Sequence, residues 1–234
     1  MAGEKENDES GKRRIFIVDD HPLVREGLAN IINQQPDLET CGEAEDSAEA
    51  LARVAESRPD LALVDISLKN DSGLDLVKKL KAEYQDLAVV VLSMHDETFY
   101  AERALRAGAS GYVMKRESTT GLLDAIRRAL QGSVFLSDTM VNVLAKRLHA
   151  GGDAMADPVQ ALSDRELEIF RLVGEGRGSA QIAEDLHISI KTVQAYCARA
   201  KDKLGIGSMV ELTRMAIRWH DAQSQVRGGG ETSV

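Results

Sequence analysis

Five polar side chains that suit phosphoryl chemistry lie at the ends of short hydrophobic runs in the sequence. They are Asp19, Asp20, Asp65, Ser93 and Lys115. Runs this short and uniform are typical of strands buried on both faces of a parallel sheet. The carboxyl ends of such strands meet at the edge where open α/β sheets bind ligands. Any one of these residues could simply begin a turn, but five of them at the ends of four strands indicate a shared site.

The three carboxylates of this set would repel one another unless a cation lies between them. Either their pKa values rise or a hard divalent ion binds there, and an octahedral Mg²⁺ site needs only two or three such oxygens, a backbone carbonyl and waters. Lys115 and Ser93 suit the oxygens of a phosphoryl group. The set therefore predicts in-line attack by the Asp65 carboxylate on an activated phosphate, with Mg²⁺ and Lys115 neutralising the developing charge.

The elements that must position these residues alternate between strand and helix. A strand pattern precedes an amphipathic helical pattern five times within about 120 residues, which predicts a doubly wound, five-stranded parallel sheet of the flavodoxin-like α/β class. The expected strands are Ile15–Val18, Leu38–Glu43, Leu61–Val64, Ala88–Leu92 and Gly111–Met114. The stretch from Asn70 to Gly73, just beyond the Asp65 strand, is expected to be a loop.

Four motifs within residues 14–132 resemble the receiver domain of bacterial two-component response regulators. They are Ile-Val-Asp19-Asp20-His, Leu-Val-Asp65-Ile-Ser-Leu, Leu-Ser93 and Gly-Tyr112-Val-Met-Lys115. The resemblance implies that Asp65 accepts a phosphoryl group from a sensor histidine kinase. It also implies that Asp20 binds Mg²⁺ directly, that Asp19 acts partly through water, and that the Ser67 carbonyl is a further ligand.

The resemblance also implies a route by which phosphorylation changes the surface of the domain. Ser93 would donate a hydrogen bond to the phosphoryl group, and Lys115 would pair with it. Tyr112 stands at the position of an aromatic switch, whose ring moves inward when the hydroxyl residue moves toward the phosphate. The loop and helix after Ser93 would then shift. Because similar receivers pair through that face, the chain is expected to form a homodimer when phosphorylated.

Residues 160–220 contain four short helical patterns with recognisable starts. Ser163-Asp-Arg-Glu166 predicts a capping box, Ser179 is the expected N-cap of the second helix, and Ser189 is that of the third. Two short helices joined by a tight turn are typical of a helix-turn-helix. The stretch from Ser189 to Leu204 carries a charge of +3, although the whole chain carries −9. A basic helix of this kind fits DNA binding, but it also fits an ordinary solvated surface.

The same segment resembles the C-terminal four-helix domain of NarL/FixJ-type, LuxR-like regulators. The matching motifs are Leu162-Ser-Asp-Arg-Glu166, Gln181-Ile-Ala, Ile188-Ser-Ile-Lys-Thr-Val193 and Lys203-Leu-Gly-Ile206. The resemblance implies a transcription factor whose third helix enters the major groove of promoter DNA as part of a dimer. The residues implied to contact DNA are Gln194, Ala195 and Ala198 toward the bases, and Lys191, Thr192, Arg199 and Lys203 toward the phosphates.

This domain departs from the common pattern of such regulators at several positions. Gln194 and Tyr196 stand where relatives commonly carry Lys and His. Ser179 and Ala180 stand where a polar-basic pair often begins the second helix, and Met209 replaces a frequent Arg. Fewer cations lower both the affinity for DNA and its salt dependence. We therefore predict weak DNA binding by the monomer and a dependence on phosphorylation-driven pairing.

These patterns divide the 234 residues into five segments. The expected segments are a disordered tail (1–13), the receiver domain (14–132), a connector helix and linker (133–159), the helix-turn-helix DNA-binding domain (160–220) and a second disordered tail (221–234). No hydrophobic run approaches the roughly 20 residues that span a bilayer. The two cysteines, Cys41 and Cys197, lie in a predicted strand and a predicted helix, which fits a reducing compartment. We expect a cytoplasmic, bacterial protein that is not an enzyme and has no membrane partner.

Two other functions compete with this interpretation. An aspartate-nucleophile phosphohydrolase would also use Asp65 and Mg²⁺, but that class typically has a second Asp two residues on, where this chain has Ser67. A phospho-switched adaptor would use its helix-turn-helix to bind protein instead of DNA, which the reduced positive charge of the domain favours. The expected partners of a transcription factor are the sensor histidine kinase and double-stranded promoter DNA, with RNA polymerase as a further candidate.

Overall fold

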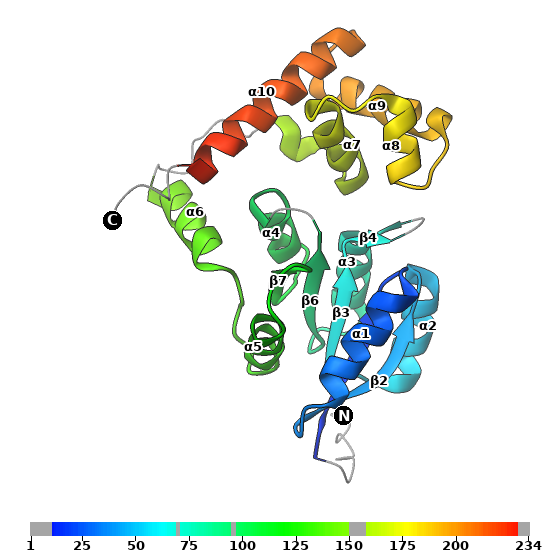
Figure 1. Cartoon of the computed structure of the whole chain (residues 1–234), viewed down its shortest axis with the longest axis vertical. Helices are drawn as coiled ribbons and strands as arrows, with labels where there is room; N and C mark the ends of the chain where they lie inside the picture. The colour runs from blue at the N-terminus through cyan, green and yellow to red at the C-terminus, as the bar shows by residue number, and fades with distance from the viewer. Residues whose placement is uncertain (1–10, 69–70, 95–96, 150–157, 229–234) are drawn as a thin grey trace. The chain divides into compact units, whose positions relative to one another are not determined.

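The computed structural model describes residues 11–68, 71–94, 97–149 and 158–228. The chain divides between Ala145 and Lys146 into two compact units, an α/β unit followed along the chain by a helical unit (Figure 1). Within the described ranges, no helix combines the length and the apolar character that crossing a membrane requires.

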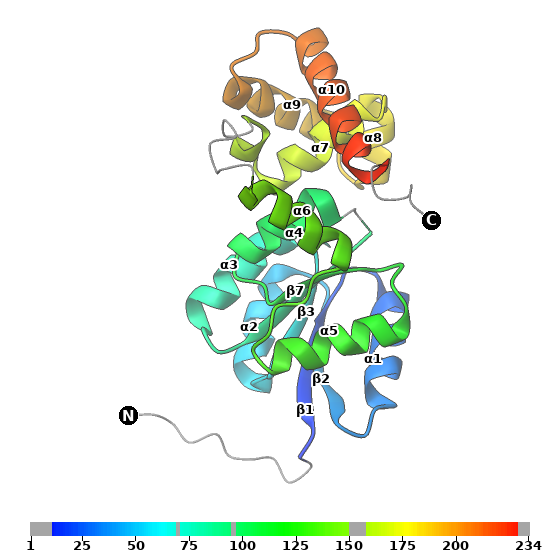
Figure 2. The ribbon, with the colours of Figure 1, turned by 90° about the vertical axis from the view of Figure 1, so that its left-hand side faces the viewer.

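The first unit is built on a five-stranded parallel sheet with the strand order β2-β1-β3-β6-β7. Its strands are β1 (Arg13–Val18), β2 (Leu38–Ala44), β3 (Leu61–Asp65), β6 (Ala88–Ser93) and β7 (Gly111–Met114). Its helices are α1 (Pro22–Asn33), α2 (Ser47–Ser57), α3 (Gly73–Glu83), α4 (Glu97–Arg106) and α5 (Thr119–Leu130). Helices α1 and α5 share one hydrophobic core with one face of the sheet (Figure 2), and α2, α3 and α4 pack on the other. The predicted doubly wound fold is confirmed.

The register of the sheet brings the predicted polar residues to one edge. Val18 pairs with Val64, so Asp19 and Asp65 follow in adjacent strands. Asp65 in turn pairs with Leu92, the residue before Ser93. Because all these strands are parallel, their carboxyl ends lie together, and the side chains that follow them share that edge.

The segment between Asp65 and α3 contains more regular structure than the sequence predicted. Two short strands, β4 (Ser67–Leu68) and β5 (Asp71–Ser72), pair antiparallel, so Asp71 and Ser72 lie in a strand where a loop was expected, while Asn70 lies outside the described residues. Gly73 then begins α3 so close to the end of β3 that a Cβ atom on it would lie 1.9 Å from the Asp65 carbonyl oxygen. Glycine is therefore required at this position by the approach of two backbones.

The segment that follows α5 pairs with the edge strand β7 through Phe135. Phe135 donates a backbone hydrogen bond to the carbonyl of Ser110, at 2.9 Å, and accepts one from the amide of Tyr112, at 3.2 Å. The segment therefore extends the sheet by one short bridge beside Gly111. Helix α6 (Asp138–His149) follows, as the sequence predicted for a connector, and residues 150–157 of the predicted linker lie outside the described residues.

From Pro158 to Gly228, the described part of the second unit after α6 consists of a short 3-10 helix (Pro158–Ala161) and four α-helices. They are α7 (Asp164–Gly174), α8 (Ser179–Asp185), α9 (Ile190–Leu204) and α10 (Met209–Gly228). Ile182 on α8 and Val193 on α9 are fully buried, and Phe170 on α7 packs edge-on against Trp219 on α10 with ring centroids 5.8 Å apart. Helices α8 and α9, joined by a tight turn, are the predicted helix-turn-helix.

The predicted helix starts are confirmed in two cases and wrong in one. Ser163 forms its capping box with Glu166, and the Ser189 hydroxyl accepts a hydrogen bond from the Thr192 amide at 3.0 Å. Ser179 is not the N-cap of α8, because Gly178 takes that position and its amide donates to the Gln181 side chain at 3.0 Å.

The last helix extends beyond residue 221, where the second tail was predicted to begin. Helix α10 continues to Gly228, since no glycine or proline interrupts residues 221–227.

Candidate functional site

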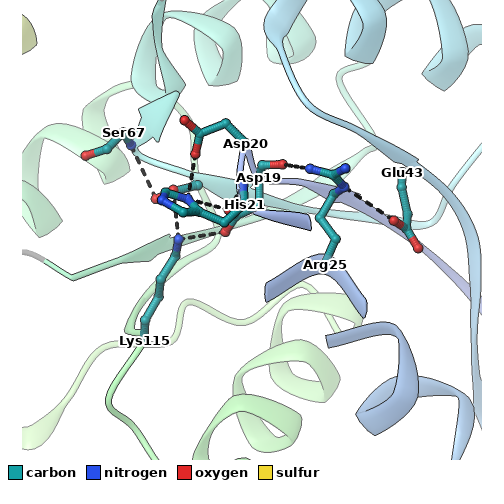
Figure 3. Close-up of polar contacts among 8 residues, drawn as sticks. Asp19, Asp20, His21, Arg25, Glu43, Ser67 and Lys115 are labelled. Atoms are coloured by element: carbon teal, nitrogen blue, oxygen red, sulfur yellow. Dashed lines mark hydrogen bonds and ion pairs between the residues drawn. The ribbon is translucent and has the colours of Figure 1, made fainter. Parts of the chain in front are cut away.

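Polar side chains gather at the carboxyl edge of the sheet, where Figure 3 shows Lys115 beside Asp19 and Asp20. The Asp65 carboxylate belongs to this cluster. Only 2% of the residue is exposed, and one carboxylate oxygen lies 2.8 Å from the Lys115 Nζ. The Ser67 amide donates to the other oxygen at 3.3 Å. Burial raises the pKa of Asp65 to about 6, and the nearby Asp19 carboxylate adds to this effect while Lys115 opposes it. At neutral pH the carboxylate is therefore mostly ionised and able to act as a nucleophile.

Lys115 holds two carboxylates at once. Its Nζ lies 2.6 Å from Asp19 and 2.8 Å from Asp65, and both acids are almost fully buried. Burial alone would lower the pKa of Lys115, but the two carboxylates outweigh it and raise the pKa above its usual value. One ammonium group thus compensates two buried negative charges, which leaves the cluster with a net negative charge that attracts a cation.

The oxygens of this cluster suit a hard divalent cation. Asp19, Asp20, His21 and Asp65 each offer a ligand atom, and these atoms all lie within 4.8 Å of one another. Three of the four donors are carboxylates, which are the ligands that Mg²⁺ prefers. The residues that the sequence predicted for a Mg²⁺ site therefore fit one chemically. Ser67, whose carbonyl was predicted as a ligand, lies in β4 beside Asp65.

The remaining predicted residues of the first unit lie on the same strands. Ser93 is fully buried at the end of β6, and its carbonyl accepts a hydrogen bond from the Lys115 amide at 2.7 Å. Tyr112 lies on the neighbouring strand β7 with 1% of its surface exposed. The sequence placed both residues on the correct strands, and their predicted roles in the switch remain predictions.

Three residues around this cluster were not predicted from the sequence. His21 donates from its amide to the Asp19 carboxylate at 2.9 Å, and its Nδ1 lies 2.7 Å from an Asp20 oxygen. Arg25 on α1 donates to the Asp19 carbonyl oxygen at 2.5 Å, and its Nε lies 3.4 Å from a carboxylate oxygen of Glu43. One signal was present for Arg25, because a cation in the first turn of a helix is unfavourable for the helix dipole and therefore suggests a specific partner.

Helix α9 presents most of its predicted DNA contacts to solvent. Six of the seven residues are exposed and Thr192 is half-buried. The exposed residues are Lys191, Gln194, Ala195, Ala198, Arg199 and Lys203. Val193, Cys197 and Ala200 are buried on the opposite side. The helix therefore has one apolar face toward its own unit and one face that is free to meet a ligand.

Two of the predicted phosphate-contacting cations already pair with an acid of their own unit. The Glu166 carboxylate lies 2.7 Å from the Lys203 Nζ and 3.5 Å from the Arg199 Nε. Arg199 also stacks over the Tyr196 ring, 4.3 Å from its centroid. Burial alone would raise the pKa of Glu166, but Lys203 and the Ser163 amide outweigh it, so the pKa lies below its usual value. DNA phosphates would have to compete with this carboxylate.

Comparison with known proteins matches each unit to a family. Residues 15–127 match the response regulator receiver domain, and residues 160–216 match the bacterial regulatory proteins of the luxR family. The oxygen regulatory protein NreC of Staphylococcus haemolyticus (strain JCSC1435) is 35% identical over 210 residues, which cover 88% of this chain and 97% of that protein. The chain belongs to the LuxR-type response regulators.

Solved structures of other response regulators resemble this one. RcsB of Salmonella enterica serovar Typhimurium, bound to a promoter in the presence of the phosphomimetic BeF₃⁻, is 28% identical with a TM-score of 0.54, over 87% of this chain and 97% of that chain. A LuxR-family response regulator from an Aurantimonas species is 31% identical with a TM-score of 0.56, over 59% of this chain and 99% of that chain. The family identification predicted from the sequence motifs is thus confirmed for this response regulator.

Proposed function

We infer that this response regulator accepts a phosphoryl group on Asp65 and that the modification controls binding of promoter DNA by α9. The observation that carries this inference is the arrangement of Asp65. A nearly buried carboxylate with a raised pKa lies between one ammonium group and two further acids at the ligand-binding edge of a doubly wound sheet. Such a carboxylate is mostly ionised at neutral pH and lies among groups that stabilise the transferred charge.

The proposed transfer takes the phosphoryl group from a phosphohistidine of a sensor kinase. An Asp65 oxygen attacks phosphorus, a P–O bond forms, the P–N bond breaks, and its electron pair returns to the histidine nitrogen. Lys115 pairs with the transferred oxygens, and the Ser93 hydroxyl donates a hydrogen bond to one of them. Asp19, Asp20, Asp65 and the Ser67 carbonyl would hold Mg²⁺, which when bound supplies positive charge to the phosphoryl oxygens.

The proposed signal passes from Ser93 to the edge of the sheet. Ser93 ends β6 and its carbonyl bonds to the Lys115 amide, so movement of either residue is transmitted to β7. Tyr112 on β7 is in turn bonded through its amide to Phe135, at the beginning of the connector. Phosphorylation adds about −1.5 to −2 charges at pH 7. We propose that this charge shifts α4 and β7 and favours pairing of two receivers.

The proposed output is dimeric binding of double-stranded promoter DNA through α9. Its exposed face offers Gln194, Ala195 and Ala198 for base contacts, and RcsB, whose structure matches 87% of this chain, is bound to a promoter. Because Glu166 competes for Arg199 and Lys203, a single copy is expected to bind weakly. Two copies held together by their receivers would bind two half-sites with a higher effective concentration.

The experiment that tests this function is binding of the full-length protein to fragmented host DNA, with and without Mg²⁺ and beryllofluoride. The expected result is enrichment of particular fragments only with the phosphoryl mimic, and loss of that enrichment in Asp65→Asn. No enrichment in either state, despite tight uptake of beryllofluoride, would favour a protein-binding adaptor. Rapid hydrolysis of phosphate esters by the protein would instead favour a phosphohydrolase.

A further inference from the structure

Arg25 connects three elements of the receiver at the acidic end of β1. Its guanidinium projects from the first turn of α1, donates to the carbonyl of Asp19 after β1, and lies 3.4 Å from Glu43 in β2. The N-cap residue of this helix, His21, makes no side-chain capping hydrogen bond. The side chain of Arg25 is only 16% exposed. These contacts make it part of the site and not a solvated surface charge.

The bond to the Asp19 carbonyl holds the peptide group that joins Asp19 to Asp20. A peptide group is planar, so the carbonyl of Asp19 and the amide of Asp20 share one plane. Every other hydrogen-bonding group of Asp19 is also engaged. Its amide bonds to Ala44, and its carboxylate bonds to Lys115 and to the His21 amide. With the carbonyl also held by Arg25, rotation of this peptide is restrained, and the backbone from which the Asp20 side chain projects keeps its orientation.

We propose that Arg25 is a positioning residue for the divalent-cation site, which acts by locking the Asp19–Asp20 peptide. The inference rests on the proposed function, since it assumes that these carboxylates bind Mg²⁺. Figure 3 shows Arg25 and Lys115 on opposite sides of Asp19, so Arg25 does not enter the ring of ligand atoms. Glu43 pairs with the guanidinium and holds it against the carbonyl. Arg25 therefore orients the ligands without touching the cation.

The direction in which Mg²⁺ affinity changes when Arg25 is replaced distinguishes a positioning role from a purely electrostatic one. Arg25 is a cation beside an acidic site, so removing its charge should by itself strengthen the binding of Mg²⁺. If the guanidinium positions Asp20, its removal should weaken binding instead. Groups that orient metal ligands typically change metal affinity about 10- to 100-fold. If Arg25 positions the ligands, the net affinity of Arg25→Gln for Mg²⁺ should fall, because the loss from displaced ligands exceeds the gain from charge removal.

The test is calorimetric titration of Mg²⁺ into the full-length protein and its variants. We expect about tenfold weaker binding in Arg25→Gln. Arg25→Lys, which can still donate to the carbonyl, should fall between that variant and the wild type. The matched control is Arg53→Gln, because Arg53 also forms an ion pair, with Glu49 at 2.9 Å, but lies on α2 away from the cluster. Its Mg²⁺ affinity should equal that of the wild type.

Melting temperatures without Mg²⁺ identify variants that fail to fold. If Arg25→Gln is unfolded at the assay temperature, Arg25→Lys decides the question by the same comparison with Arg53→Gln. Affinity in the Arg25 variant equal to or tighter than that of the control overturns the positioning role while leaving the proposed function intact. A wild-type protein that binds no Mg²⁺ overturns both, since there would be no cation site to position.

Discussion

The buried carboxylates of the receiver destabilise the fold, and the proposed phosphoryl transfer explains why they are there. Asp19 and Asp65 are almost fully buried and share the single ammonium of Lys115. Burial of two acids with one cation leaves uncompensated charge, which is unfavourable in the folded state. A protein selected only for stability would not keep this arrangement, whereas the proposed phosphoryl-acceptor site would require it.

Asp65→Asn should therefore stabilise the receiver unit. The pKa of Asp65 rises from 3.8 to about 6 on folding. Each pKa unit corresponds to about 1.4 kcal/mol, so the free energy of unfolding at pH 7 should increase by about 2–3 kcal/mol. Scanning calorimetry of the full-length protein with EDTA measures this change. A lower melting temperature of the receiver in Asp65→Asn would contradict the expectation.

The same substitution predicts a pH dependence of definite sign. The folded protein takes up the Asp65 proton near pH 6, whereas the unfolded chain does so near pH 3.8. Between these values the folded state binds more protons, so the wild type gains stability as the pH falls. The advantage of Asp65→Asn should be largest above pH 6 and should shrink toward pH 4. An advantage that stays constant over this range would show that it has another cause.

Glu166 in the second unit should show the opposite pH dependence. Its pKa is lowered on folding, because Lys203 and the Ser163 amide outweigh the effect of burial. A lowered pKa adds stability above the unfolded value near 4.5 that is lost as the pH falls through the folded value. Glu166→Gln, which keeps an oxygen for the capping box, should cost about 1–2 kcal/mol at pH 7 and less in acid. The fluorescence of Trp219, the one tryptophan in the chain, reports unfolding of this unit.

At the scale of elements, the local signals of the sequence were sufficient for the fold. The five strands and the capping residues Ser163 and Ser189 were predicted because hydrophobic runs and cap patterns are properties of neighbouring residues. Arg25 and Glu43 were not predicted, because their contact joins a helix to a strand 18 positions later. The pairing of Glu166 with Lys203 escaped prediction for the same reason. The position of a cation in the first helical turn suggested a partner for Arg25 but could not identify it, because tertiary packing sets such contacts.

The junction between β3 and α3 depends on one glycine. Gly73→Ala would place its Cβ 1.9 Å from the Asp65 carbonyl oxygen, so the end of β3 or the start of α3 must move. We expect a loss of at least about 1–3 kcal/mol in unfolding free energy and loss of phosphorylation of Asp65. Gly27→Ala is the control, because nothing lies within 4 Å of its Cβ position on α1. That variant should gain about 0.5–1 kcal/mol, since alanine favours a helix. Phosphorylation of Gly73→Ala at the wild-type rate would contradict the role of the close approach.

The turn between α8 and α9 contains backbone strain that a substitution can relieve. His187 has a φ of 51°, in the left-handed region, which costs about 1–2 kcal/mol for a residue with a Cβ. His187→Gly should therefore stabilise the second unit by about 0.5–1 kcal/mol after the entropy cost of glycine. Gly205, with a φ of 67° after α9, gives the converse test, because Gly205→Ala should destabilise by a similar amount. Denaturation followed by Trp219 fluorescence distinguishes the two signs.

At the scale of the whole chain, the distribution of charge limits how this regulator can bind DNA. The protein carries a net charge of −9, and residues 158–220 contain nine Lys and Arg against eight Asp and Glu. Two of those cations pair with Glu166. Few positive charges are left to displace counterions from DNA, so the affinity of one copy should be low and its salt dependence shallow.

Phosphorylation should therefore strengthen DNA binding by bringing two copies together. We expect beryllofluoride with Mg²⁺ to strengthen binding of the full-length protein to its sites by at least about tenfold, through pairing of two copies. Titrations over a range of salt concentrations should show a steeper slope for the paired form, because it contacts more phosphates. A fragment of residues 158–220 that binds as tightly as the activated full-length protein would contradict this expectation.

The bridge between Phe135 and the edge of β7 also determines where an isolated receiver fragment can end. An unpaired edge strand exposes amide and carbonyl groups that can pair with another chain and cause aggregation. A receiver ended at residue 132 would lose both backbone bonds of Phe135 and leave β7 uncovered on that side. One ended at Ser137 would keep them. The folding boundary of the receiver therefore lies beyond its last sheet-covering helix, and its solubility as a separate fragment depends on residues that its sequence motifs do not include.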